Sequence, residues 1–150
     1  YEIHWRDWSS DVCSSDLDQL EILLENIISN AITYSHTNSS VEISTEINRN
    51  QRSANVIITD HGIGIENKDL PNIFNEYFYS PRAAMHNKSS SGIGLSIVRI
   101  AAINNKLKIK VTSEPGAGTT FTVVFDNIEL PSRQQANKPA AGISPNPSQP

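Results

Sequence analysis

One amphipathic helix constrains the fold of this chain more than any other stretch of its sequence. Between residues 20 and 36 the apolar side chains recur at intervals of three and four, which predicts a helix with one buried stripe. The residues of this stripe are Leu20, Leu23, Leu24, Ile27, Ile28, Ala31 and Ile32. Asp18 followed by Glu21 is a variant of the capping box, so the helix should begin just before the stripe. The stripe therefore faces the core of a folded domain.

A second, narrow polar face runs beside the stripe on the same helix. At about 100° per residue, its members are Asn26, Asn30 and Thr33, with Tyr34 between the two faces. Glu25 and Ser29 point elsewhere. Asn disfavours helix because its side chain competes for backbone hydrogen bonds, so two aligned Asn residues indicate that their oxygens are used. The alternative is two exposed polar residues on a solvated face.

The composition allows one domain and excludes several classes of protein. A chain of 150 residues with 37% hydrophobic content can bury one core and little more. The net charge of −4 provides no basic surface for nucleic acid, and no apolar run is long enough to cross a membrane. A single cysteine, Cys13, excludes an internal disulfide framework and a multi-cysteine metal site. We therefore expect a soluble protein of the cytoplasm.

The two ends of the chain differ in composition from the segment between them. Residues 1–17 have neither helical nor strand periodicity and resemble a translated sequencing-adapter peptide, so we expect this segment not to belong to the native protein. Residues 131–150 are rich in Pro, Ser, Gln, Ala and Asn and are expected to form a disordered tail. These boundaries leave residues 18–130 as the domain.

Two hairpins are predicted from alternating apolar and polar residues. Residues 41–47 alternate as a half-buried strand does, and a polar turn separates them from a second strand at 55–59. Residues 107–111 and 119–125 alternate in the same way around a turn at 115–118. Between the hairpins, a short helical segment is expected at 68–76.

The sequence Asp60-His61-Gly62-Ile63-Gly64-Ile65 follows directly after the second predicted strand. Glycines at alternate positions allow a ligand to approach the main chain closely. An ionised carboxylate at the floor of an apolar pocket only accepts hydrogen bonds, so Asp60 suits an exocyclic amine such as that of adenine. A tight turn without a ligand also accounts for this pattern, and the residues alone leave both interpretations open.

A second glycine motif opens a second helix. Residues 77–91 lack periodicity and are predicted to be a mobile loop, of the kind that closes over phosphates. Residues 92–95, Gly-Ile-Gly-Leu, then lead into a helix whose first backbone N–H groups would form an anion site. An ordinary flexible helix cap is the alternative. Asn104 and Asn105 should end this helix in the left-handed conformation.

In this order, the motifs resemble the ATP-binding catalytic domain of sensor histidine kinases, in the superfamily that includes gyrase, Hsp90 and MutL ATPases. The resemblance covers residues 16–127. The matching blocks are the N box at 26–34, the first glycine box at 60–64, the F box at 73–78, the second glycine box at 92–95 and the closing hairpin at 113–121. It implies an α+β fold of the Bergerat type, a two-layer α/β sandwich with a mixed, mostly antiparallel sheet and helices on one face.

The resemblance also implies roles for individual residues. Asn30 would coordinate the Mg²⁺ that bridges the phosphates of ATP, and Asn26 would support the metal or the phosphates. Asp60 would hold the adenine amine, with Tyr34 beside the nucleoside and Thr119 completing the adenine site. The two glycine boxes would provide the ring pocket and the backbone contacts to phosphate through Gly62, Ile63, Gly64, Ile65, Gly92, Ile93, Gly94 and Leu95.

The sequence departs from the family at three positions. The family often has Lys where Thr33 stands, Arg where Tyr79 stands and Gly where Ser90 stands. Two cations that contact phosphate are therefore missing, and phosphoryl transfer needs positive charge. We expect Arg82, or after it Lys88, to compensate, which makes Arg82 and Asn26 the candidate catalytic residues. If neither compensates, the domain would bind ATP yet transfer phosphate slowly.

The resemblance favours phosphoryl transfer over hydrolysis. Gyrase-like relatives have a Glu one helical turn before the metal-binding Asn; here Asn26 occupies that position, and Glu25 is rotated by about 100° from it. The implied function is transfer of the ATP γ-phosphoryl group to a histidine on a separate dimerisation domain, which serves a response regulator.

His4 has no helix around it that would make it the acceptor, so the chain is expected to be the catalytic fragment of a two-component sensor kinase. The acceptor histidine would then lie upstream in the full-length protein or on another chain. No nucleic-acid partner and no direct membrane contact are expected. The alternatives are a serine kinase of the anti-sigma-factor type and a non-catalytic nucleotide-binding module.

Overall fold

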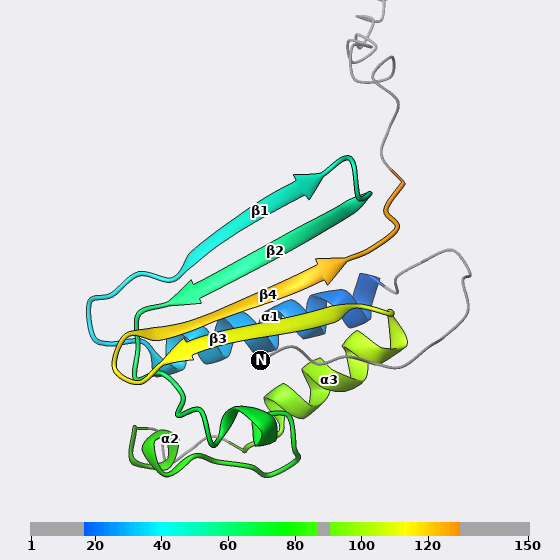
Figure 1. Ribbon diagram of the computed structural model, residues 1–150. Helices are drawn as coiled ribbons and strands as arrows, with labels where there is room; N and C mark the ends of the chain where they lie inside the picture. Colours follow the sequence, from blue (N-terminus) through cyan, green and yellow to red (C-terminus); the bar gives the residue numbers. More distant parts are fainter. Residues whose placement is uncertain (1–16, 87–90, 130–150) are drawn as a thin grey trace, which may run out of the picture.

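The computed structural model describes residues 17–86 and 91–129 of the chain. A helix, a hairpin, a group of helices and a second hairpin follow one another along it, as in an α+β protein, with a sheet on one side and helices packed on the other (Figure 1). The elements are α1 (Leu17–Tyr34), β1 (Glu42–Asn48), β2 (Ser53–Asp60), the 3₁₀ turn η1 (Leu70–Asn72), α2 (Pro81–His86), α3 (Gly94–Asn104), β3 (Lys108–Glu114) and β4 (Gly118–Phe125).

The four strands form one sheet in the order β1-β2-β4-β3. Both predicted hairpins are present, and the pairing of β2 with β4 joins them. A mixed, mostly antiparallel sheet was expected, and each pairing among the described strands is antiparallel. In one cross-strand row Ile58 lies opposite Phe121, which lies opposite Val111, and all three are buried. The sheet thus has one apolar face, which the helices cover.

The helix α1 supplies the centre of the core. Leu23, Ile27 and Ala31 are buried against α3 and the sheet, as the predicted stripe required. Ile32 differs, because it is 63% exposed. At about 100° per residue it lies roughly 140° around the helix from Ile27, outside the arc that the core covers. The stripe is therefore narrower than its apolar residues suggest.

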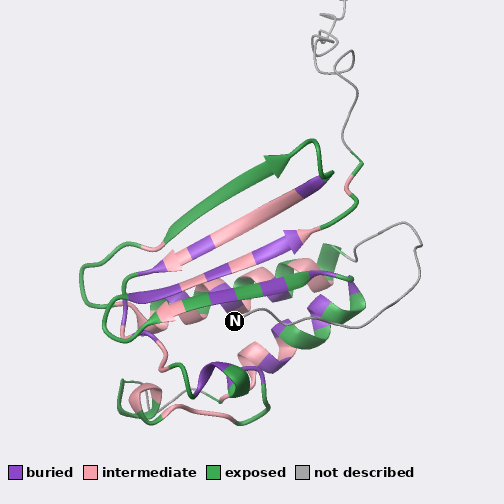
Figure 2. Cartoon of the chain, in the orientation of Figure 1, coloured by how far each residue is buried: buried purple, intermediate pink, exposed green. Residues whose placement is uncertain are grey.

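The strand β1 is exposed along its whole length, and the prediction of a half-buried strand was wrong in this respect. All seven of its residues are exposed, including Ile43 at 55% and Ile47 at 60%. β1 is an edge strand paired with β2, and the helices do not extend over it (Figures 1 and 2). The alternation of apolar and polar residues located the strand correctly. Its burial could not be predicted in this way, because it depends on helices that are distant in the sequence.

The predicted loop at 77–91 contains a helix, so that prediction was wrong for α2. Ser80 begins this helix: its Oγ accepts a hydrogen bond from Ala83 N–H at 3.1 Å, and its carbonyl accepts one from Ala84 N–H at 3.0 Å. Pro81 follows at the first helical position, where its fixed φ favours helix. The Ser-Pro pair was the local signal for this helix. Residues 87–90 lie outside the described part.

The helix α3 ends differently from the prediction. Asn105 has φ −96°, and the left-handed residue is Lys106, with φ 54°. The Asn105 side chain instead donates a hydrogen bond to the carbonyl of Ala101 at 2.9 Å. Asn105 therefore caps the end of α3 with a hydrogen bond from its carboxamide and not by adopting the left-handed backbone conformation.

The predicted domain boundaries fall near the limits of the described residues. Leu17, which was assigned to the leader, is the first residue of α1. The expectations for residues 1–16 and for the tail at 131–150 lie outside the described residues. Among the helices that the structure describes, none combines the length and hydropathy needed to cross a membrane.

Candidate functional site

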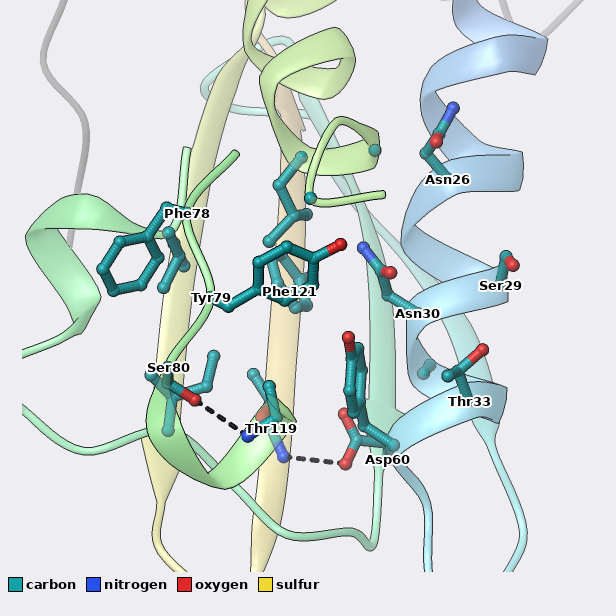
Figure 3. A pocket seen from close by; sticks show the side chains of 18 of the residues that line it. Asn26, Ser29, Asn30, Thr33, Asp60, Phe78, Tyr79, Ser80, Thr119 and Phe121 are labelled. Atoms are coloured by element: carbon teal, nitrogen blue, oxygen red, sulfur yellow. Dashed lines mark hydrogen bonds between the residues drawn. The ribbon is translucent and has the colours of Figure 1, made fainter. Parts of the chain in front are cut away.

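A cavity of about 540 Å³ opens between α1, the end of β2, the start of α3 and the segment 78–83 (Figure 3). Its volume lies in the range typical of small-molecule sites. Predicted site residues from four separate stretches of the sequence meet in its lining: Asn26, Asn30, Tyr34, Asp60, Ile63, Gly64, Ile65, Gly92, Ile93, Gly94, Leu95 and Thr119. Gly62 and Arg82 are not among its lining residues.

Asp60, the last residue of β2, is a buried acceptor at one end of this cavity. It is only 5% exposed, and its Oδ1 accepts a hydrogen bond from the backbone N–H of Thr119 at 3.2 Å (Figure 3). Burial raises the pKa of the Asp60 carboxyl, and the backbone N–H groups of Thr119 and Gly62 partly oppose this effect. A desolvated carboxylate of this kind favours a ligand that donates an N–H group.

The main chain after Asp60 is fixed by contacts with two other elements. Ile63 N–H donates to the carbonyl of Tyr34 at 3.0 Å, and Gly116 N–H donates to the carbonyl of Ile63 at 2.8 Å. A Cβ atom at Gly62 would lie 2.9 Å from Asp60 Oδ1 and would collide with the Tyr34 carbonyl. A glycine is therefore required at position 62, because a side chain there would collide with the end of α1 and press on the Asp60 carboxyl group.

Ser113 on β3 joins this glycine segment to β4, a role that the sequence did not suggest. Its Oγ accepts a hydrogen bond from Ile65 N–H at 2.8 Å and donates to the carbonyl of Gly118 at 2.9 Å. It also lies 2.9 Å from Thr119 Oγ1, which is then the donor. One hydroxyl group thus holds two walls of the cavity together. No sequence motif marks it apart from its place before the β3–β4 turn.

The two Asn residues of α1 lie beside the start of α3. A Cβ atom at Gly94 would be 2.9 Å from Asn26 Oδ1 and 3.8 Å from Asn30 Nδ2. Asn26 Nδ2 donates to the carbonyl of Ile22 at 2.7 Å, which orients its Oδ1 toward Gly94. Asn30 projects into the cavity (Figure 3). Carboxamide oxygens in this position fit the oxygen donor set of Mg²⁺.

The other residues of this helix face follow the prediction with one exception. Thr33 lines the cavity, and Glu25 is exposed outside it. Ser29 was expected to point away, but it also lines the cavity, so that expectation was wrong. The polar face of α1 is therefore wider by one residue, since Ser29 lies roughly 60° from Asn26 around the helix.

The first turn of α3 presents backbone N–H groups at the other end of the cavity. The helix starts at Gly94, and its N-cap residue Ile93 makes no side-chain capping hydrogen bond. Ser96 instead donates from Oγ to the Ile93 carbonyl at 2.7 Å. The N–H groups of an uncapped first turn, at the positive end of the helix dipole, attract anions.

The sequence analysis proposed no individual site role for several cavity residues. The aromatic and apolar ones come from the segment matched to the F box, from the residue that follows it and from β4: Ile73, Phe78, Tyr79 and Phe121. Ser80 and Ala83 join them from the start of α2. The aromatic residues at the start of the predicted loop were the available signal, since a solvated loop seldom needs three of them.

Arg82, the predicted phosphate-binding cation, lies on α2 outside the cavity lining. Its charge acts on Glu66, whose pKa is lowered mainly by its hydrogen bond and ion pair with Lys68 and to a smaller extent by Arg82. The ion pair joins Lys68 Nζ and Glu66 Oε2 at 2.7 Å. Lys88 and Ser90, the other residues considered at this end, lie outside the described residues.

Comparison with known proteins agrees with this geometry. Residues 15–129 match the family described as histidine kinase-, DNA gyrase B- and HSP90-like ATPase. The sensor-like histidine kinase SenX3 of Mycobacterium tuberculosis is 41% identical over 112 residues, which are 73% of this chain and 26% of SenX3. The sensor protein kinase GraS of Staphylococcus aureus is 36% identical over 115 residues, 77% of this chain and 32% of GraS.

Solved structures with the same fold are catalytic domains of histidine kinases. The mycobacterial sensor histidine kinase MprB superposes with a TM-score of 0.62 at 23% identity, over 77% of this chain and 74% of MprB. The catalytic domain of the histidine kinase ThkA also gives 0.62, at 21% identity, over 76% of this chain and 70% of that catalytic-domain chain. At these identities the likeness concerns the fold, and it confirms the predicted Bergerat-type α+β architecture.

The chain therefore belongs to the family of histidine kinase-, DNA gyrase B- and HSP90-like ATPases. Within this family it is a histidine-kinase ATPase domain, homologous to the sensor kinases SenX3 and GraS. It spans about a quarter to a third of the length of these curated relatives. The predicted family is thus confirmed, and the serine-kinase and non-catalytic alternatives are not favoured.

Proposed function

We propose that this domain binds ATP with Mg²⁺ in the cavity and presents the γ-phosphoryl group to a histidine on a separate domain. The observation that carries the proposal is the shape of one cavity, with a buried acceptor at one end and a helix N-terminus beside two carboxamides at the other. Asp60 and Asn30 both line it. A nucleotide has the complementary polarity, with an amine on its base and anionic phosphates.

At the base end, Asp60 accepts the hydrogen bond of the adenine amine. Ile63, Ile65 and Leu95 line the cavity and provide the apolar surface on which a purine ring packs. Thr119 completes this end, because its backbone N–H orients the Asp60 carboxylate. An oxo group at the same position of the base would face a second acceptor, so the site would disfavour guanine.

At the phosphate end, Asn30 and Asn26 offer side-chain oxygens, and the first turn of α3 offers N–H groups. Mg²⁺ in kinases is held by few protein ligands together with the phosphates, and when bound it neutralises phosphate charge. This agrees with a site built on Asn30 with support from Asn26. ShkA, which was solved full-length in complex with AMPPNP, contains the same fold: it superposes with a TM-score of 0.59 at 20% identity, over 73% of this chain and 21% of the ShkA chain.

Transfer to a histidine is preferred to hydrolysis because none of the described lining residues provides a carboxylate placed to orient water. Asp60 is the acid in the described lining and is used for the base, while Glu25 is exposed outside the cavity. The acceptor histidine would lie on a dimerisation domain, in the same full-length protein or in another chain, and would pass the phosphoryl group to a response regulator. Such a domain operates in the cytoplasm, where ATP is available.

The test is a phosphoryl-transfer assay in trans. The chain is incubated with γ-labelled ATP, Mg²⁺ and the histidine-containing dimerisation domain of a related sensor kinase. We expect acid-labile label on that domain, and none when the chain carries Asn30→Ala. Acid-stable label would indicate transfer to serine, and ATP binding without any transfer would indicate a binding module; either result would contradict the proposal.

A further inference from the structure

Tyr79 lies in residues 77–83, which we call the lid segment, where this segment passes the start of α3. Tyr77 N–H donates to the carbonyl of Gly92 at 3.0 Å, which ties the segment to the second glycine motif. A Cβ atom at Gly92 would lie 2.8 Å from Tyr79 Cε2 and 3.1 Å from Cζ, so the tyrosine ring fills the space that the glycine leaves. Gly92 has φ +67°, a second reason for glycine at this position. The Tyr79 ring is therefore held against the phosphate end of the cavity.

The hydroxyl group of Tyr79 points across the cavity toward Asn30 (Figure 3). Asn30 in turn lies close to Gly94, in the first turn of α3. The phenol hydroxyl group thus lies on the side of the cavity that is formed by the first turn of α3 and the carboxamides of α1. Phe121 of β4 lines the same cavity.

The charge of the cavity wall makes this hydroxyl group important. Among the lining residues that the structure describes, Asp60 is the acidic one, and none is Lys, Arg or His. Thr33 and Tyr79 contribute neutral hydroxyl groups to the phosphate end. From the residues that the structure describes, a phosphate group placed there therefore meets neutral donors, and the Tyr79 O–H is the one that the lid segment directs toward Asn30.

We propose that Tyr79 determines how this site recognises the phosphates of its nucleotide, by donating its phenolic O–H to a phosphate oxygen. This inference rests on the proposed function and deepens it, since it assigns a residue that selects nucleoside di- and triphosphates over the bare nucleoside. A hydrogen bond from a neutral donor to an anion contributes to affinity on the order of tenfold. It also depends less on ionic strength than an ion pair does.

The test is calorimetric titration of the whole chain and its variants with Mg·ATP, Mg·ADP and adenosine. Tyr79→Phe keeps the ring and removes the O–H group. We expect it to weaken binding of both phosphate-bearing ligands about tenfold and to leave adenosine binding unchanged. Tyr77→Phe is the matched control, since Tyr77 is 70% exposed and its side chain is not among the lining residues. It should bind all three ligands as the unmodified chain does.

A second variant, Tyr79→Arg, tests the charge argument. It should bind Mg·ATP at least as tightly as the unmodified chain at low salt and lose affinity more steeply as salt is added. The inference is overturned if Tyr79→Phe binds Mg·ATP with unchanged affinity, or if it loses adenosine binding to the same extent. Failure of the proposed function would look different, because the unmodified chain itself would then bind no Mg·ATP. A thermal melt of each variant verifies that it is folded.

Discussion

At the scale of single residues, Asp60 has a role in the fold, at the end of β2, and a role in the proposed site, as a buried acceptor. Its carboxyl group ends a central strand and is almost fully buried, and burial raises its pKa above the ordinary value of 3.8. The backbone N–H groups of Thr119 and Gly62 stabilise the ionised carboxylate and so oppose part of this increase in pKa. Carboxyl groups whose pKa is shifted by burial in a cavity are common at functional sites, where they bind a ligand.

Asp60 should make the stability of the domain depend on pH. Because its pKa is higher in the folded state, the folded state binds the proton more tightly, so its contribution is fully present below pH 3.8 and is lost as the pH rises through the raised pKa. Asp60→Asn removes this titration. In urea unfolding at a series of pH values, the difference in unfolding free energy, unmodified chain minus variant, should fall as the pH rises from 3.8 toward neutrality. A constant difference would contradict the prediction.

Ser113 gives a second prediction at this scale. Ser113→Ala leaves Ile65 N–H and the Gly118 carbonyl without their partner in the cavity wall. Unfolding free energy should fall by about 1–3 kcal/mol, and nucleotide affinity should fall as well because Ile65 lines the cavity. Thr112→Ala is the control, since Thr112 is exposed on the same strand. Equal losses in the two variants, measured by urea unfolding and calorimetry, would show that Ser113 has no special role.

At the scale of elements, the contact between α1 and α3 is narrow enough to test with one methyl group. In Gly94→Ala the new Cβ atom would lie 2.9 Å from Asn26 Oδ1, the end of a side chain that can turn away. We expect Mg·ATP affinity to fall on the order of tenfold, with no loss of thermal stability, because Ala favours helix over Gly. Calorimetry and thermal melts measure both quantities.

A double-mutant comparison shows whether Gly94→Ala acts through Asn26. If it does, Asn26→Ala alone weakens Mg·ATP binding to a similar extent, and the double variant is little worse than either single one. Additive losses would mean that the methyl group acts elsewhere, for instance on the N–H groups of α3.

Elements whose signals are local could be predicted from the sequence. The stripe of α1, both hairpins and the two glycine motifs depend on periodicity and on residue types within a short window, and they are present as expected. β1 was placed correctly but its burial was not, because burial depends on where the helices stop. The site was predictable where a motif marks it, as at Asp60. The hydrogen bonds of Ser113 and the packing of the Tyr79 ring against Gly92 were not predictable, because they join separate segments of the chain.

At the scale of the whole molecule, the cavity is the place where most elements of the domain meet. Its walls come from α1, the end of β2, the lid segment, α3 and the start of β4, which are far apart in sequence. A ligand that fits the cavity contacts all of them and binds only when they are assembled. Binding to the folded state alone raises its stability by mass action.

Mg·ATP should therefore stabilise the entire domain against heat. At a ligand concentration a hundred times the dissociation constant the gain is about 2.7 kcal/mol, which for a domain of this size raises the melting temperature on the order of 10 °C. Scanning calorimetry with and without Mg·ATP measures the shift. Asp60→Asn should abolish most of it, because an amide presents an N–H group to the adenine amine where the carboxylate presents only acceptors. An equal shift in the variant would mean that the base does not lie against Asp60, whereas a shift in neither protein would mean that the cavity is not a nucleotide site.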